Sequence, residues 1–239
     1  MNHLFLITSA IKTKFGMFEE EKRIAQTFQT LESIRKRIPN AKIVIIESSA
    51  IPVEEELLER LRGVTTFIVN MSGDKILKHI FDNTENWDIA KNMSELLAFN
   101  SALGMLEEQT DIFEGVDRIH KLSGRYTLND NFNLNVYERF PDKIILPMRY
   151  KSQFTDALDN TNIPFQYMSR LWSWPKSLHE EIKTFYKSAS DEFVERLKQK
   201  SRVDMEHLLF LLLPPEHIRE IPTIGVKGQL GQNGRRVEN

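Results

Sequence analysis

The chain has 239 residues, of which 41% are hydrophobic and 28% are charged, and it contains no cysteine. This composition is typical of a globular protein with a sizeable core, and it excludes disulfides, thiolate nucleophiles and cysteine-ligated zinc. The formal net charge of −2 provides no basic field that would attract nucleic acid or an anionic membrane. A chain of this length forms one large domain or two small ones.

The first 70 residues alternate between strand and helix patterns. Short runs of apolar and β-branched residues predict strands, and apolar residues at helical spacing predict the helices between them. The expected elements are strand 3–7, helix 19–38, strand 42–46, helix 53–61 and strand 65–69. This alternation implies an α/β fold with a parallel sheet and right-handed crossovers.

Beyond residue 70 helical patterns predominate. We expect helices over 74–81, 87–108, 176–200 and 204–213, and strands over 116–121, 144–148 and 165–172. The segment 225–239 holds four of the ten glycines, which indicates either a flexible tail or a loop over a site.

The apolar runs are short. The longest, residues 208–213, has six residues, whereas a membrane span needs about 20. The first residues also lack the features of a signal peptide. We therefore expect a cytoplasmic protein without a membrane span.

Polar residues follow the first two predicted strands. Thr8 and Ser9 come after the first strand, and Glu47, Ser48 and Ser49 come after the second. Ligands of open α/β sheets bind at the carboxyl ends of the strands, and these groups suit a ribose or a base edge, although caps and turns are the ordinary role of each. The dinucleotide glycine fingerprint and the P-loop pattern are absent.

The first predicted helix carries a polar stripe beside its apolar one. Arg23, Gln26, Thr27 and Thr30 recur at i, i+3, i+4 and i+7, so they share one face. Lys and Glu are more common on a solvated face, so the stripe indicates a partly enclosed surface on which Arg23 would meet a phosphate. A purely structural face explains the pattern equally well.

The segment 117–128, DRIHKLSGRYTL, is the densest cluster of polar chemistry. Lys121 and Arg125 supply cations, Ser123 a hydroxyl, Gly124 a position where backbone can approach a ligand, and Tyr126 an aromatic face for a base or sugar. Together these groups resemble a diphosphate-binding edge. A structural turn is the alternative interpretation.

Two later helices carry further candidates. Lys91, Asn92 and Glu95 lie one turn apart, where they form either a surface ion pair or contacts with sugar hydroxyls. Asp204 and Glu206 open another helix. A carboxylate there could act as a general base toward an acceptor hydroxyl, and Asp204 could equally be a helix cap.

An ordered series of short motifs resembles a group of glycosyltransferases found in bacteria and viruses. The motifs are FLITSAI, R-x-x-Q-T-x-x-T-L-E-S-I-R, PNAKIVIIESS, KNMSE, KLSGRYTL, MEHLLF and IGVKGQLGQNG, of which KLSGRYTL and the helix string are the most specific. The resemblance covers nearly the whole chain. It implies a single Rossmann-like domain of GT-A type over 1–224, with a nucleotide-binding part at about 1–130 and an acceptor or catalytic part at about 131–224.

The resemblance also implies roles for individual residues. The donor would be a nucleotide-diphosphate sugar, a UDP- or GDP-sugar, and the acceptor a glycan or another hydroxyl compound. Lys91 and Glu95 would lie near the donor sugar, residues 121–126 near the diphosphate, and Glu206 at a catalytic or acceptor-binding position. The residues implied near the nucleoside are Thr8, Ser9, Arg23, Thr27 and Glu47.

One motif departs from the GT-A pattern. Such enzymes usually hold Mn²⁺ or Mg²⁺ with an Asp-x-Asp motif, but the corresponding stretch here reads HKLSGRY. Either Lys121 and Arg125 replace the metal, which we favour slightly, or carboxylates elsewhere bind it. His207 and His217 offer no coordination set.

From these motifs we expect a glycosyltransferase. A nucleotidyltransferase on a similar sheet, or a nucleotide-sugar-binding protein without catalysis, are the alternatives, because one architecture hosts many chemistries. The motifs do not specify the donor base, the sugar, the acceptor or the oligomeric state.

Overall fold

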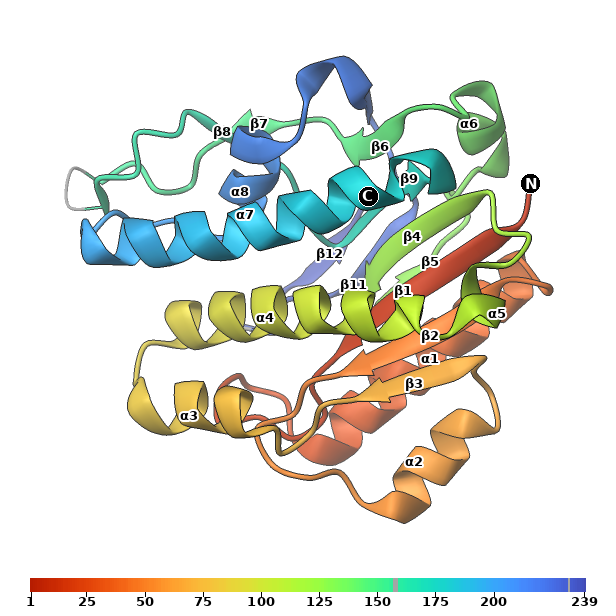
Figure 1. The fold of residues 1–239 in the computed structure, drawn as a ribbon, viewed down its shortest axis with the longest axis horizontal. Coiled ribbons are helices and arrows are strands. Elements are labelled where there is room, and N and C mark those ends of the chain that lie inside the picture. The colour runs from red at the N-terminus through yellow and green to blue at the C-terminus, as the bar shows by residue number, and fades with distance from the viewer. Residues whose placement is uncertain (157–158, 232) are drawn as a thin grey trace.

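The computed structural model describes residues 1–156, 159–231 and 233–239. A seven-stranded sheet with strand order β10-β6-β9-β4-β1-β2-β3 forms its centre (Figure 1). Strand β9 runs antiparallel to β4 and β6, and the other neighbouring pairs are parallel. The strands are β1 (His3–Ser9), β2 (Lys42–Glu47), β3 (Phe67–Asn70), β4 (Arg118–Ser123), β6 (Ile144–Pro147), β9 (Leu171–Pro175) and β10 (Ile218–Ile221).

Helices cover both faces of this sheet, as Figure 1 shows. Helices α1 and α2 contribute apolar residues to the core on one face, and α4, α7 and α8 contribute to the core on the other. The helices are α1 (Glu20–Arg37), α2 (Glu55–Arg62), α3 (Lys75–Asn83), α4 (Trp87–Glu107), α5 (Thr110–Phe113), α6 (Leu134–Arg139), α7 (His179–Lys198) and α8 (Met205–Leu212), with 3₁₀ turns η2 (Lys176–Leu178) and η3 (Pro215–His217).

The two cores explain why β1 is apolar along its length. Leu4 and Leu6 pack into the core beneath α4 and α7, whereas Phe5 and Ile7 pack into the core beneath α1 and α2. Successive side chains of a strand point to opposite faces, so a central strand covered on both sides reads as a continuous apolar run. The expected α/β fold with a mostly parallel sheet flanked by helices is confirmed.

Residues 225–231 and 233–239 contain a hairpin, where the sequence left open a flexible tail or a loop over a site. Strands β11 (Val226–Gln229) and β12 (Arg236–Glu238) pair antiparallel, and β11 also pairs with β5 (Tyr126–Leu128). Gly225, with φ of 78°, lies so close to Phe132 that a Cβ would come within 2.2 Å of its backbone. The glycines therefore serve tight turns and close packing, two uses that a sequence pattern does not distinguish from flexibility.

The expected single strand over 165–172 is wrong. The chain forms a short hairpin of β7 (Tyr150–Lys151) and β8 (Phe165–Gln166), turns away, and enters the central sheet only at Leu171. Between β8 and β9 the backbone N–H of Tyr167 donates to the carbonyl of Glu206, and Ser169 reaches the charged groups described below. These tertiary contacts divide one apolar run into two strands.

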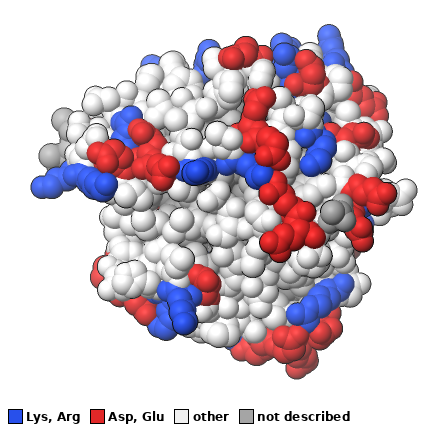
Figure 2. All heavy atoms as spheres, viewed as in Figure 1, with Lys and Arg blue, Asp and Glu red and all other residues white. Residues whose placement is uncertain are grey.

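The charges on the surface are mixed. On the face in Figure 2, basic and acidic side chains of the described residues are intermixed. Within the described residues, each helix is either too short or too polar to cross a bilayer.

Candidate active site

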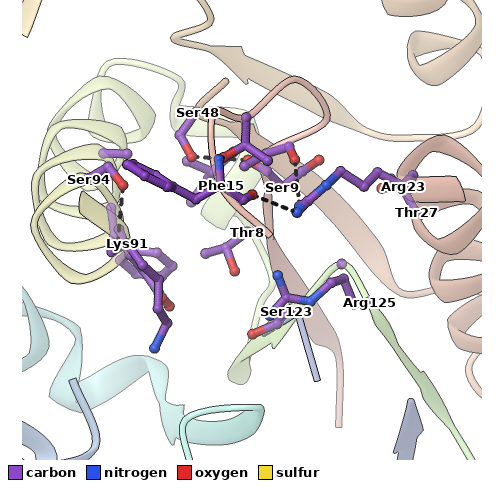
Figure 3. A pocket seen from close by; sticks show the side chains of 18 of the residues that line it. Thr8, Ser9, Phe15, Arg23, Thr27, Ser48, Lys91, Ser94, Ser123 and Arg125 are labelled. Atoms are coloured by element: carbon purple, nitrogen blue, oxygen red, sulfur yellow. Dashed lines mark hydrogen bonds between the residues drawn. The ribbon is translucent and has the colours of Figure 1, made fainter. Parts of the chain in front are cut away.

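A cavity of about 940 Å³, including its open mouth, lies at the carboxyl ends of β1, β2 and β4. This is where open α/β sheets bind ligands. The loop after β1, helices α1, α3 and α4, the β4–β5 turn and the C-terminal hairpin contribute to its wall (Figure 3). The predicted site residues that line it are Thr8, Ser9, Arg23, Thr27, Lys91, Glu95, Ser123, Gly124 and Arg125.

The β4–β5 turn enters the cavity because Gly124 allows it to lie against β1. The Gly124 N–H donates to the Thr8 carbonyl at 2.8 Å. A Cβ at Gly124 would lie 3.1 Å from the Thr8 oxygen and 3.6 Å from Thr27 Oγ1. The sequence predicted that the backbone at this glycine approaches a ligand, whereas the close approach in the structure is to Thr8 of β1, and it places Ser123 and Arg125 on the cavity wall.

Arg125 is the cationic group of this turn that remains available. Its Nε is buried without a hydrogen-bond partner, and among the described residues no carboxylate lies within salt-bridge distance of its guanidinium. A Cβ at Gly231, on the C-terminal hairpin, would lie 2.9 Å from Arg125 Nη1, so the hairpin packs against this side chain. A half-buried guanidinium with unused donors beside open space is suited to an anionic ligand.

Lys121 does not have the role that the sequence predicted. Its side chain is fully buried, and Nζ lies 2.7 Å from Glu95 Oε1 and 3.0 Å from both Ser123 Oγ and the Ser169 carbonyl. Its ammonium is thus engaged within the protein by two hydrogen bonds and one ion pair. Lys121 lies on the same face of β4 as Ser123, toward Glu95 on α4, and is itself not among the residues that line the cavity.

Lys91 and Glu95 bring opposite charges to the cavity from one face of α4. Lys91 Nζ lies 3.7 Å from Glu206 Oε2. Burial opposes its charged form, but Glu206, Glu95 and Asp204 outweigh that effect and raise the pKa of Lys91. Burial also acts to raise the pKa of Glu95, but Lys121 and Lys91 hold it below its ordinary value.

Glu206 lies behind Lys91 and does not line the cavity. Its Oε1 accepts a hydrogen bond from Ser169 Oγ at 2.6 Å. Its Oε2 is buried without a hydrogen-bond partner among the described residues. Lys121, Glu95, Lys91 and Glu206 therefore form a chain of alternating charges that Ser169 closes, since the Ser169 carbonyl accepts from Lys121.

Asp204 is the N-cap of α8, as the alternative interpretation predicted. Its carboxylate accepts from the backbone N–H of His207 at 3.0 Å and lies 2.6 Å from His207 Nδ1. Burial opposes ionisation of Asp204, but His207 outweighs it, so the pKa of Asp204 is lowered. A carboxylate engaged in this way, outside the cavity wall, does not fit the predicted general base.

Arg23 organises the loop after β1. It donates to the backbone carbonyls of Phe18, Ala10 and Phe15 at 3.0, 3.1 and 3.3 Å, and Figure 3 shows the bond to Phe15. Burial, together with the charge of Arg125, lowers its pKa to about 10. Each of its nitrogens already has a carbonyl partner, so Arg23 shapes the wall where it was expected to meet a phosphate.

Glu47 holds the same loop from the other side. It is fully buried and accepts from the backbone N–H groups of Ile11 and Ser49, at 3.2 and 2.9 Å, and from the Ser49 hydroxyl. Burial raises its pKa despite these bonds. The expected contact of Glu47 with a nucleoside is therefore corrected, because the carboxylate is turned into the protein.

Tyr126 and Asn92 also lie away from the cavity. The Tyr126 ring is 3% exposed and belongs to the core, so it offers no free face for a base or sugar. Asn92 is fully buried, accepts from the Met205 N–H at 3.2 Å and donates to the Asp88 carbonyl at 2.8 Å. Its amide thus joins α4 to α8.

Sequence reasoning missed the aromatic part of the wall. Phe15, Phe81, Trp87 and Phe99 line the cavity, although three of them lie in helical patterns that are typical of core residues. The signal that could have been used is Phe15, an aromatic residue in the polar loop directly after the first strand.

The residues present do not fit the metal site of a GT-A enzyme. The end of β4 offers a hydroxyl, a glycine and a guanidinium, so it lacks the carboxylates with which proteins usually hold Mn²⁺ or Mg²⁺. Across the described ranges, three or more His, Asp or Glu side chains are nowhere grouped so that they could hold a metal ion. We derive no step through a metal.

No protein-family model and no curated protein sequence matches the chain. Its fold is similar to that of an active-site mutant of LgtC, with a TM-score of 0.53 and 11% identity, over 92% of this chain and 72% of that one. Galactosyltransferase LgtC in complex with donor and acceptor sugar analogues gives a TM-score of 0.51 and 11% identity, over 92% and 73%. The likeness establishes a GT-A type of fold.

Proposed function

We propose that this protein is a glycosyltransferase that moves a sugar from a nucleotide-diphosphate-sugar donor, a UDP- or GDP-sugar, to an acceptor hydroxyl in glycan synthesis. The observation that carries the proposal is Arg125, a guanidinium with an unpartnered buried Nε in the cavity at the carboxyl ends of the strands. The likeness of the fold to LgtC supports the same reaction class.

In the proposed complex the diphosphate contacts Arg125, the Ser123 hydroxyl and the backbone around Gly124. The acceptor oxygen attacks the anomeric carbon and loses its proton to a base, for which Glu206 is the candidate. The bond between the anomeric carbon and the phosphate oxygen breaks, and the diphosphate leaves with its negative charge. Arg125 and Lys91 stabilise that charge because they face it in a partly enclosed site.

A nucleotide-sugar-binding protein without catalysis is the second candidate function. It is favoured by the burial of Glu206 Oε2, because the candidate base is not among the residues that line the cavity. A nucleotidyltransferase is disfavoured, because it would require carboxylates that hold a metal beside a triphosphate, and the described residues do not group in that way.

Thermal shift with a panel of nucleotide sugars, with and without Mn²⁺, tests the proposal. A donor that binds the folded protein raises the melting temperature by mass action. Arg125→Ala should weaken donor binding roughly 10- to 100-fold, because a charge-assisted hydrogen bond contributes about 1.5–3 kcal/mol. Arg60→Ala, which removes an exposed guanidinium from α2, is the control and should bind like the wild type.

Transfer and slow donor hydrolysis are then assayed with the donor that binds. Product formation supports glycosyl transfer, and binding without either reaction supports the second candidate. A folded Arg125→Ala protein with wild-type donor affinity would falsify the assignment of the β4–β5 turn.

A further inference from the structure

The two lysines of the charged chain are held very differently. Lys121 is fully buried and has three partners within 3.0 Å. Lys91 is 30% exposed, its carboxylate partner Glu206 is 3.7 Å away, and its hydrogen bond to Asn92 Oδ1 is long at 3.4 Å. Contacts of this length contribute little to fixing a side chain. Lys91 is therefore the less tightly held of the two cations, and the one that lines the cavity.

Glu206 depends on Lys91 for its neutralisation. One carboxylate oxygen is bonded to Ser169, but Oε2 is buried without a hydrogen-bond donor among the described residues, and the Lys91 ammonium is the cation paired with it. A buried carboxylate that loses its cation is strongly disfavoured. Glu206 therefore draws Lys91 toward itself and away from the centre of the cavity.

A phosphate in the cavity would draw Lys91 in the other direction. Lys91 and Arg125 both line the cavity, and Figure 3 shows them on either side of Thr8. The charge of Arg125 acts against that of Lys91, so the two cations repel each other until an anion lies between them. A bound anion attracts both Lys91 and Arg125 and offsets the repulsion between them.

We propose that Glu206 competes with the anionic part of the ligand for the Lys91 ammonium, so that binding transfers Lys91 from the carboxylate to the phosphate. The inference rests on the proposed function only for the nature of that ligand. The exchange leaves Glu206 without its nearest cation once the donor is bound. A proton from an acceptor hydroxyl is then the group that can neutralise the carboxylate, which would link acceptor activation to donor binding.

A double-mutant cycle with inorganic pyrophosphate as the probe tests this competition, with Kd measured by titration calorimetry. Glu206→Gln retains an oxygen that can accept from Ser169 but removes the charge, so it should bind pyrophosphate about 3- to 10-fold more tightly than the wild type. Lys91→Met should bind about 10-fold more weakly. The double variant should match Lys91→Met within about twofold, because Glu206 acts through Lys91.

Glu220→Gln is the control for charge removal in general. Glu220 pairs with Arg149 at 3.4 Å, outside the cavity wall, so this variant should leave the pyrophosphate affinity unchanged. Unfolding curves verify that each variant is folded, and Lys91→Gln replaces Lys91→Met if the latter does not fold.

Three outcomes overturn the inference. Glu206→Gln binds pyrophosphate no more tightly than the wild type, or the double variant binds it more tightly than Lys91→Met, or neither the wild type nor Glu206→Gln binds pyrophosphate. The proposed function fails separately. If the cycle behaves as expected but nucleotide sugars never bind, the competition stands and the donor class is wrong. If a nucleotide sugar binds and is turned over by the wild type while Glu206→Gln gains nothing, the competition alone fails.

Discussion

Strands β1 and β4 carry buried polar side chains at both ends, and the two ends differ in what those groups face. At the amino end, His3 Nδ1 and His120 Nε2 lie 2.9 Å apart, and Arg118 Nη1 donates to Ser173 Oγ at 2.9 Å. Arg118 Nη2 donates to the carbonyls of residues 140, 141 and 143. At the carboxyl end the cavity opens, with Arg125 on its wall.

Arg118 at the amino end and Arg125 at the carboxyl end differ in whether their side-chain donors are already bonded to the protein. Arg118 is fully buried and its ring neighbour is Tyr137 at 5.4 Å. Its Nε, like that of Arg125, has no hydrogen-bond partner, but its terminal nitrogens are bonded to the protein. Arg125 has unused donors next to open space. A charge inside a protein therefore indicates a ligand only where its donors are free and a cavity adjoins them.

The largest expected effect is the loss of stability in Lys121→Met, because this substitution removes the counter-ion of Glu95. The substitution leaves the Glu95 carboxylate without the ammonium 2.7 Å away, and breaking a buried pair in this way costs about 3–5 kcal/mol. Urea unfolding at pH 7 measures the loss.

The double variant Lys121→Met with Glu95→Gln should recover part of the lost unfolding free energy, because the unpaired charge is removed. If Lys121 were a phosphate ligand instead, the single variant would keep its stability and lose pyrophosphate affinity.

An intermediate effect is expected at the amino end as the pH falls. Burial, followed by the charges of the N-terminus and Arg118, lowers the pKa of His3 to about 4, and burial also lowers the pKa of His120 well below its ordinary value. Between about pH 6.5 and 4 the unfolded chain therefore binds more protons than the folded one. Stability is complete above this window and falls within it by up to about 1.4 kcal/mol per pH unit for each histidine.

Unfolding by urea at a series of pH values between 4 and 7 measures this slope. His120→Gln should reduce the slope of unfolding free energy against pH by up to about 1.4 kcal/mol per pH unit, which corresponds to one proton. His79→Gln, at an exposed position on α3, should leave the slope as in the wild type. An unchanged slope in a folded His120→Gln protein would show that the histidine pair is not the acid-sensitive element. Carboxylates such as Glu95, whose pKa is lowered, respond only at still lower pH.

The smallest expected effect concerns the packing of the hairpin on Arg125. A Cβ at Gly231 would lie 2.9 Å from Nη1 and 3.3 Å from Nη2, so Gly231→Ala should displace the guanidinium and weaken pyrophosphate binding by less than about 5-fold, or roughly 1 kcal/mol. Calorimetric titration measures the change. In Gly104→Ala a Cβ meets no atom within 4 Å, so this helical control should keep the affinity and gain slight stability.

The sequence alone predicted the fold class, an α/β fold with a mostly parallel sheet, and proposed a site at the carboxyl ends of its strands. The apolar runs of β1 and β2 and the helical spacing in α1 and α4 are local consequences of burial on one or two faces. The polar residues after those strands also had to meet at one edge of a parallel sheet. For this reason Thr8, Ser9 and Arg125 were predicted at the cavity that they line.

Only the tertiary structure decided which of the polar groups are free to bind. Lys121 and Arg125 look equivalent in the string KLSGR, but Lys121 is paired with Glu95 on α4, whereas the turn at Gly124 places Arg125 beside the cavity. Glu47 and Asn92 are likewise engaged by backbone groups brought from other segments. A hydrogen-bond partner from a distant part of the chain leaves no local pattern in the sequence, so the fold alone selects the residues that remain available for a ligand.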